Sequence, residues 1–134
     1  GPTAGGVGIL LRKGLFTVVK SRSLHVGRLL GAQLRHKELG TVHVFCLHYE
    51  RDRDEQDDQR HAIQTALRQA LDHAAQDLCI LAGDFNMCFN AEDRVSMQED
   101  MLQMKEPSAA ERKWATTFGD FTCSELSSYT WCNK

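Results

Sequence analysis

Residues 78–86 read Leu-Cys-Ile-Leu-Ala-Gly-Asp-Phe-Asn, an apolar run that ends abruptly in a polar segment. The run is too short for a helix of ordinary length and a glycine follows it, so Leu78–Ala82 is predicted to be a strand. Another strand is predicted at Thr41–Tyr49, and a helix from about Asp58 to Gln76 lies between the two. Strand, helix and strand in this order indicate a crossover inside a layered α/β domain.

The central helix and strand are predicted from their periodicity. Apolar residues of the helix recur at the spacing of one buried stripe: Ile63, Ala66, Leu67, Ala70, Leu71 and Ala74. Polar residues between them are expected to face water: Gln64, Arg68, Gln69 and Asp72. On Thr41–Tyr49 both alternating faces are mostly apolar, so this strand is expected to be central and covered on both sides.

Two further strand pairs are predicted toward the N-terminus. Val7–Arg12 and Phe16–Lys20 flank a turn, and Gly27–Arg35 is expected to pair with Thr41–Tyr49 through residues 36–40.

Helical structure is predicted toward the C-terminus. The spacing of Met97, Met101 and Met104 is helical and indicates a packing stripe. A second helix is predicted at Ala109–Phe118, because Ser108 and Glu111 have the spacing of a capping box. Two aromatic residues of this helix are expected to anchor it to the core: Trp114 and Phe118.

Length and composition fit a single globular domain over residues 1–134, with 42% hydrophobic and 25% charged residues. No apolar run is long enough to cross a bilayer, so no membrane partner is expected. The formal charge of −2 argues against bulk binding of polyanions but leaves room for a local positive groove. The sequence begins with Gly1-Pro2 and not with Met, and we interpret these two residues as a remnant of protease cleavage.

The five cysteines are an odd number without a CxxC pair. This pattern favours reduced thiols over a disulfide framework or a zinc site. We therefore expect an intracellular protein and consider the nucleus as one compartment.

The chemically informative segment is Gly83–Asn86. On an extended backbone, Asp84 and Asn86 would point the same way at the carboxyl end of a strand, where open α/β sheets place their sites. Asp84 is then suited to orient or deprotonate a water, and Asn86 to hydrogen-bond a phosphate oxygen. The structural alternative is an Asx turn that closes the strand. Phosphate-loop, nucleophile-elbow and zinc-protease motifs are absent from the sequence.

Four ordered blocks resemble the endonuclease/exonuclease/phosphatase superfamily, and especially the endonuclease domains of LINE-type retrotransposons. The sharpest is Gly83-Asp84-Phe85-Asn86, followed by Glu92-Asp93-Arg94. The other blocks are residues 5–10 (GGVGIL), Val42–Tyr49, and Thr130-Trp131 with Asn133.

This resemblance implies a partial two-sheet α/β sandwich of the DNase I-like type with flanking helices, and a phosphodiesterase that uses Mg²⁺ or Mn²⁺ to act on DNA. Asp84 would handle the water nucleophile and ligate the metal, and Asn86 would hold the phosphate. The strand that ends in His48-Tyr49 leaves either residue to fill the family's phosphate-facing position. The catalytic set is then Asp84, Asn86 and His48, with Tyr49 and Arg94 as substrate-binding residues.

The family also has a metal-binding Glu before the first of these blocks and a final Asp-His pair after the last, and residues 1–134 contain no counterpart of either. On this interpretation we expect the chain to be the middle of the family's domain and a poor nuclease. The alternative is a catalytically inactive relic that serves as a binding or assembly module. A phosphatase acting on phosphoinositides or sphingolipids is a third hypothesis. Uncovered sheet edges would favour a homodimer.

Overall fold

The structure, a computed structural model, describes residues 5–49, 57–74, 76–86, 95–98, 101–104, 106–109, 111–113 and 121. The chain divides into two compact units, residues 1–86 and 87–134, and each is considered by itself. The single domain over residues 1–134 stays a prediction.

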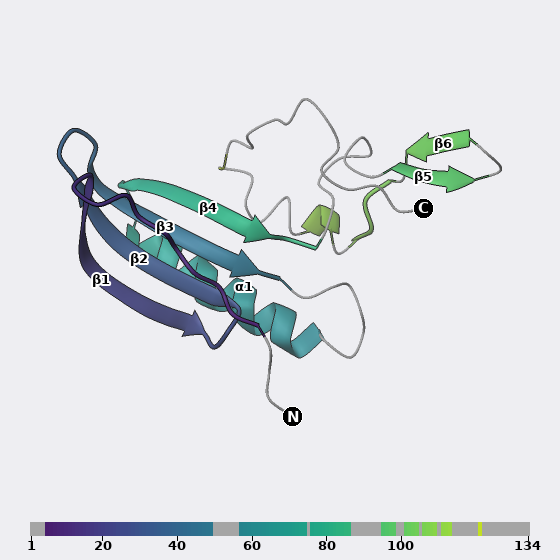
Figure 1. The fold of residues 1–134 in the computed structure, drawn as a ribbon. Helices are drawn as coiled ribbons and strands as arrows, with labels where there is room; N and C mark the ends of the chain where they lie inside the picture. Colours follow the sequence, from purple (N-terminus) through teal and green to yellow (C-terminus); the bar gives the residue numbers. More distant parts are fainter. Residues whose placement is uncertain are drawn as a thin grey trace. The chain divides into compact units, whose positions relative to one another are not determined.

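Unit 1 is built on a four-stranded sheet in the order β1-β2-β3-β4 (Figure 1). The strands are β1 (Phe16–His25), β2 (Leu29–His36), β3 (Gly40–His48) and β4 (Leu78–Asp84). The first three are antiparallel neighbours, whereas β4 runs parallel to β3. The helix α1 (Asp57–Ala74) connects these parallel strands. The α/β class and the predicted crossover are therefore confirmed.

The helix α1 packs through the stripe that its periodicity predicts. Ile63 and Leu67 are fully buried, and Arg68, Gln69 and Asp72 are exposed as expected. The helix packs against β1, β2 and β4. Gln64 departs from its prediction, because it is half-buried and hydrogen-bonds a tyrosine instead of facing water. No helix among the described residues is long and apolar enough to span a bilayer.

The two faces of the sheet are covered differently. On the face of α1, alternate residues of β3 and the residue after it are buried: Phe45, Leu47 and Tyr49. On the opposite face a smaller cluster of Ala32, Leu34 and Val42 is packed by Ile9 and Leu11 of the N-terminal segment, and by Phe16 of β1 and Val44 of β3. The strand at 41–49 is central, as expected. Its two faces are buried at different places, the face of α1 at Phe45, Leu47 and Tyr49 and the opposite face at Val42.

The N-terminal segment differs from its prediction. Val7–Arg12 forms no strand, and β1 pairs with β2 instead. The segment crosses the sheet (Figure 1), and it contributes apolar side chains to the small cluster without joining the hydrogen-bonded ladder. An apolar run can pack on a sheet face without pairing along its edge, and periodicity alone does not separate the two cases.

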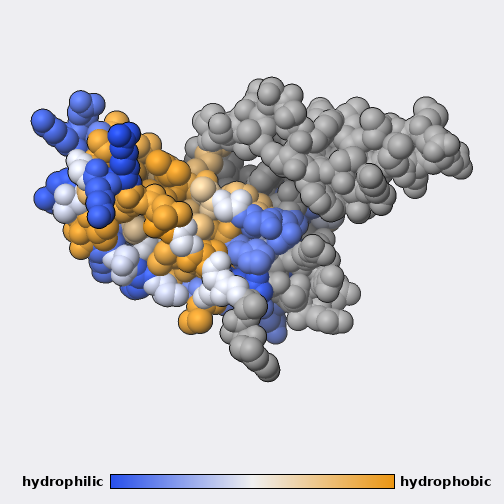
Figure 2. All heavy atoms as spheres, viewed as in Figure 1, coloured by the Kyte–Doolittle hydropathy of each residue, from blue (hydrophilic) through white to orange (hydrophobic). Residues whose placement is uncertain are grey.

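The strand β4 alternates between half-buried and exposed side chains. Cys79 and Leu81 are half-buried on the face of α1, whereas Leu78 and Ile80 are 47% and 46% exposed on the other face. Figure 2 shows that apolar surface gathers over this unit. β4, the most apolar strand of the sequence, is the last strand of the described sheet. Part of its apolar surface is exposed.

In unit 2 the described residues include an antiparallel strand pair, β5 (Val95–Gln98) and β6 (Met101–Met104). The helical interpretation of Met97, Met101 and Met104 is therefore wrong, because all three lie on these strands. Short segments with apolar residues three or four apart fit either conformation, and cross-strand pairing decides here.

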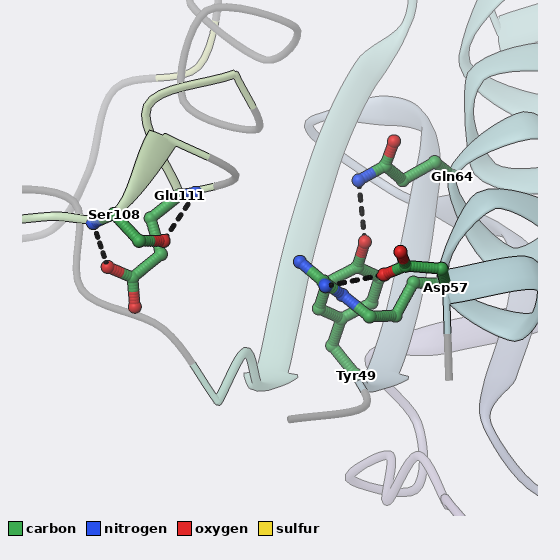
Figure 3. Close-up of polar contacts among 6 residues, drawn as sticks. Tyr49, Asp57, Gln64, Ser108 and Glu111 are labelled. Atoms are coloured by element: carbon green, nitrogen blue, oxygen red, sulfur yellow. Dashed lines mark hydrogen bonds and ion pairs between the residues drawn. The ribbon is translucent and has the colours of Figure 1, made fainter. Parts of the chain in front are cut away.

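The capping box at the start of the second predicted helix is confirmed (Figure 3). The Ser108 N–H donates to Glu111 Oε2 at 2.8 Å, and the Glu111 N–H donates to Ser108 Oγ at 3.2 Å. Ala109 and residues 111–113 are helical. Trp114 and Phe118 lie outside the described residues.

Candidate functional site

The carboxyl ends of β3 and β4 meet at one edge of the sheet. His48 and Asp84 are register partners there, so their side chains leave the same face of the sheet. The Tyr49 N–H donates to the Asp84 carbonyl at 2.8 Å and extends the parallel ladder to its last residue. Asp84 is exposed and His48 is half-buried. A carboxylate and an imidazole are thus placed side by side on adjacent strands.

Gly83 lets the two strands approach closely just before this pair. Its φ is +137°, and a Cβ atom built on it would lie 1.9 Å from the carbonyl oxygen of Leu47. No side chain fits that space without displacing the backbone of β3. The glycine of the GDFN block is therefore a packing requirement that sets where Asp84 sits relative to His48.

Asn86 closes the strand by an Asx turn. Its φ is +46°, in the left-handed region, and its backbone N–H donates to Asp84 Oδ1 at 2.9 Å. Its side-chain Nδ2 donates to the carbonyl of Tyr49 at 2.7 Å. The expected extended backbone from Asp84 to Asn86 is therefore wrong, and the structural alternative describes the turn. Asn86 ties the Asp84 carboxylate to the end of β3.

His48 is held by Arg28, a residue outside the predicted catalytic and substrate-binding set. Arg28 Nη1 lies 3.0 Å from His48 Nδ1, and the His48 N–H donates to the Arg28 carbonyl at 2.8 Å. A signal for Arg28 was present in the predicted hairpin. In the antiparallel register, His36 pairs with Gly40 and Leu29 pairs with Leu47. One more step along this register places residue 28 opposite residue 48.

Tyr49 points to the other face of the sheet, into the core (Figure 3). Its side chain is fully buried, its hydroxyl accepts a hydrogen bond from Gln64 Nε2 at 2.5 Å, and the guanidinium of Arg60 lies 5.5 Å from its ring centroid. Arg60 also donates to Asp57 Oδ1 at 3.2 Å. Of the two residues that the sequence left open, His48 is therefore the one beside Asp84, and Tyr49 joins β3 to α1.

Another cluster of chemically active residue types lies at the opposite end of these strands. His43 and Cys79 are register partners, and His43 Nε2 lies 2.9 Å from Asp77 Oδ2. Burial, and secondly the Asp77 carboxylate, raise the pKa of the Cys79 thiol. At neutral pH the thiol is protonated, so the cluster has no activated nucleophile.

The described residues do not form a complete metal site. Within them, no three His, Cys, Asp or Glu side chains gather to hold a metal ion. Asp84 supplies one carboxylate, the oxygen ligand type that Mg²⁺ prefers. The other predicted residues, Arg94, Glu92-Asp93 and the block at 130–133, lie outside the described part of the chain.

A comparison with protein families supplies the context for this site. A family model described as Endonuclease/Exonuclease/phosphatase family matches residues 1–132. The mixed α/β structure with its four-stranded sheet is consistent with the DNase I-like fold of that family. No curated protein matches the chain.

Proposed function

The chain belongs to the endonuclease/exonuclease/phosphatase family, and on this premise we propose that it is a phosphodiesterase-type nuclease of the LINE-type group that acts on DNA. The observation that carries the proposal is the pairing of His48 with Asp84 at the carboxyl ends of two parallel strands. This is the edge at which open α/β sheets place their reactive groups.

Each residue of the pair has a role that its chemistry allows. The exposed Asp84 carboxylate accepts the proton of a water that attacks phosphorus, while one P–O ester bond breaks and the leaving oxygen takes a proton from solvent. His48 donates a hydrogen bond to a phosphate oxygen, where negative charge develops. Asn86 is a positioning residue, because its backbone N–H holds Asp84 Oδ1 and its side chain holds the end of β3. Arg94 contacts the DNA backbone in this proposal.

A divalent cation, Mg²⁺ or Mn²⁺, is part of the proposal because the family generally uses one. When bound, such an ion polarises the scissile phosphate. Asp84 would be its carboxylate ligand. With one carboxylate, the described residues suit an ion that also takes water and substrate phosphate oxygens as ligands. We therefore expect weak metal binding in the absence of DNA.

The test is nicking of supercoiled plasmid with Mg²⁺ or Mn²⁺ and with EDTA as a control. Asp84→Asn is the informative variant, because asparagine keeps an oxygen that can accept the Asn86 N–H but cannot take a proton from water. We expect the nicking rate to fall by about 100-fold or more. The matched control is Asp72→Asn, which changes an exposed carboxylate on α1 and should leave the rate unchanged.

The outcomes separate the proposal from its alternative. Equal rates in the two variants would reject the role of Asp84. Metal-independent nicking would reject the role of the cation. A folded protein that retains DNA binding but does not nick would instead support the inactive binding module.

A further inference from the structure

We propose that Arg28 is a positioning residue for His48: it holds the imidazole in the tautomer whose remaining N–H can donate to a phosphate oxygen. The catalytic consequence rests on the proposed function. The tautomer itself follows from contacts of Arg28 and His48 and can be tested without any activity.

The tautomer follows from which nitrogen atoms of the two side chains can donate a hydrogen bond and which can accept one. Arg28 Nη1 lies 3.0 Å from His48 Nδ1. A guanidinium has only N–H donors and no acceptor, so Nδ1 must accept this hydrogen bond and carry no proton. The proton of the neutral ring is therefore on Nε2, which is left as the donor of the ring.

The backbone around Arg28 fixes this contact. The Arg28 N–H donates to the His25 carbonyl at 3.0 Å, which closes the turn between β1 and β2, and the turn passes through Gly27 with φ +70°. The Arg28 carbonyl in turn accepts the His48 N–H at 2.8 Å. Since both residues are also paired through the main chain, their side chains start from fixed positions and meet with little loss of freedom.

The orientation matters because Asp84 is the register partner of His48 on the other side. A carboxylate accepts hydrogen bonds, so a ring released by Arg28 is able to donate an N–H to Asp84 instead. That arrangement would occupy the proton needed for a phosphate oxygen and would engage the carboxylate that handles the water. In this proposal the Arg28 contact limits the turning of the ring and so favours donation to a phosphate oxygen over donation to Asp84.

The direct test is the imidazole nitrogen spectrum of the full chain labelled with ¹⁵N-histidine. The signals of His48 are assigned by their loss in His48→Gln. In the wild type we expect an unprotonated, hydrogen-bonded Nδ1 and a protonated Nε2 at neutral pH. In Arg28→Met the Nδ1 signal should shift and the second tautomer should become populated. A His48 ring protonated at Nδ1 in the wild type would overturn the inference.

Two other variants separate orientation from folding. Arg28→Lys keeps a donor and the charge, so it should retain part of the wild-type Nδ1 signal. Arg35→Met is the matched control, because Arg35 is an exposed arginine of β2, and it should leave the His48 spectrum unchanged. If Arg28→Met does not fold, an Nδ1 signal in folded Arg28→Lys that moves only part of the way from its wild-type position supports the contact. An unchanged spectrum in both Arg28 variants would reject it.

The catalytic part is tested by a double-mutant cycle on plasmid nicking. Arg28→Met should lower kcat/KM by about 10-fold to 100-fold, by analogy with the losses found when a partner that orients a metal-ligating histidine is removed. In the His48→Gln background the same change should have almost no further effect. Independent losses that multiply would show that Arg28 acts without His48. If no variant nicks DNA, the proposed function fails while the spectrum still decides the tautomer.

Discussion

At the residue scale, the site depends on a glycine as much as on its polar side chains. Gly83 lies against the backbone of β3, so it determines the separation of the strands that carry His48 and Asp84. Other residues are disfavoured at position 83 because their Cβ atom would clash with the carbonyl oxygen of Leu47, in addition to the unfavourable backbone conformation.

We predict that Gly83→Ala lowers the free energy of unfolding by about 3 kcal/mol or more, because left-handed strain adds to the overlap with the Leu47 carbonyl. Gly14→Ala is the matched control: its φ is +84°, but nothing lies within 4 Å of the added Cβ. That variant should lose only about 1 kcal/mol. Urea unfolding of both variants measures the difference, and equal losses would mean that β3 yields to the added methyl group.

Some residue positions of the site can be predicted from the sequence, and others cannot. The meeting of His48 and Asp84 follows from two parallel strands that end together, and the position of Arg28 follows from the hairpin register. The left-handed conformation of Asn86 does not follow, because asparagine adopts both extended and left-handed backbone. The direction of Tyr49 followed from alternation, but its burial depended on the helix that covers that face.

At the element scale, the contact between the end of β3 and α1 is a polar one inside an apolar layer. The Tyr49 hydroxyl and Gln64 hydrogen-bond under the helix, with Arg60 over the ring. This contact explains why Gln64 leaves the solvent-facing pattern of its helix. A tyrosine buried at the end of a strand needs a partner for its hydroxyl, and the helix provides one.

We predict that Tyr49→Phe lowers the free energy of unfolding by about 1 kcal/mol, because it removes the hydroxyl that Gln64 contacts. Gln64→Leu should cost less in the Tyr49→Phe background than in the wild type. Gln69→Leu, on the exposed side of α1, is the control and should show no such coupling. Additive losses for Tyr49 and Gln64 in urea unfolding would contradict a direct interaction.

Elements were predictable where periodicity and pairing agree. The helix α1 and the strands β2, β3 and β4 follow from buried stripes, alternation and the turns between them. The prediction failed at Val7–Arg12 and at the methionines of β5 and β6, where a short apolar pattern does not reveal whether the backbone finds a partner strand.

At the scale of the whole molecule, β4 is an edge strand of the described four-stranded sheet. It lies at the end of the strand order, carries exposed Leu78 and Ile80, and has no charge before Asp84. Edge strands of soluble proteins normally carry charges, prolines or bulges that prevent pairing with another chain. The homodimer expected from the sequence would use this strand.

We predict that the protein self-associates as its concentration rises, and that Ile80→Lys weakens this association by about tenfold or more, because a charge on the edge opposes pairing. Val26→Lys is the control, since Val26 is 87% exposed but lies in the turn between β1 and β2. Sedimentation velocity over a concentration series measures both. A wild type that stays monomeric throughout, or equal effects of the two variants, would rule out the edge as the interface.

The parallel arrangement of β3 and β4 also bears on how this scaffold can change over evolution. The chain leaves the sheet at Tyr49 and again at Asn86, and both exits are clamped by hydrogen bonds to the neighbouring strand. The sequences that follow these exits can therefore be exchanged or lengthened while the paired imidazole and carboxylate stay in place. On the proposed function, exchanging these sequences would transfer substrate preference between members of such a lineage without moving His48 or Asp84.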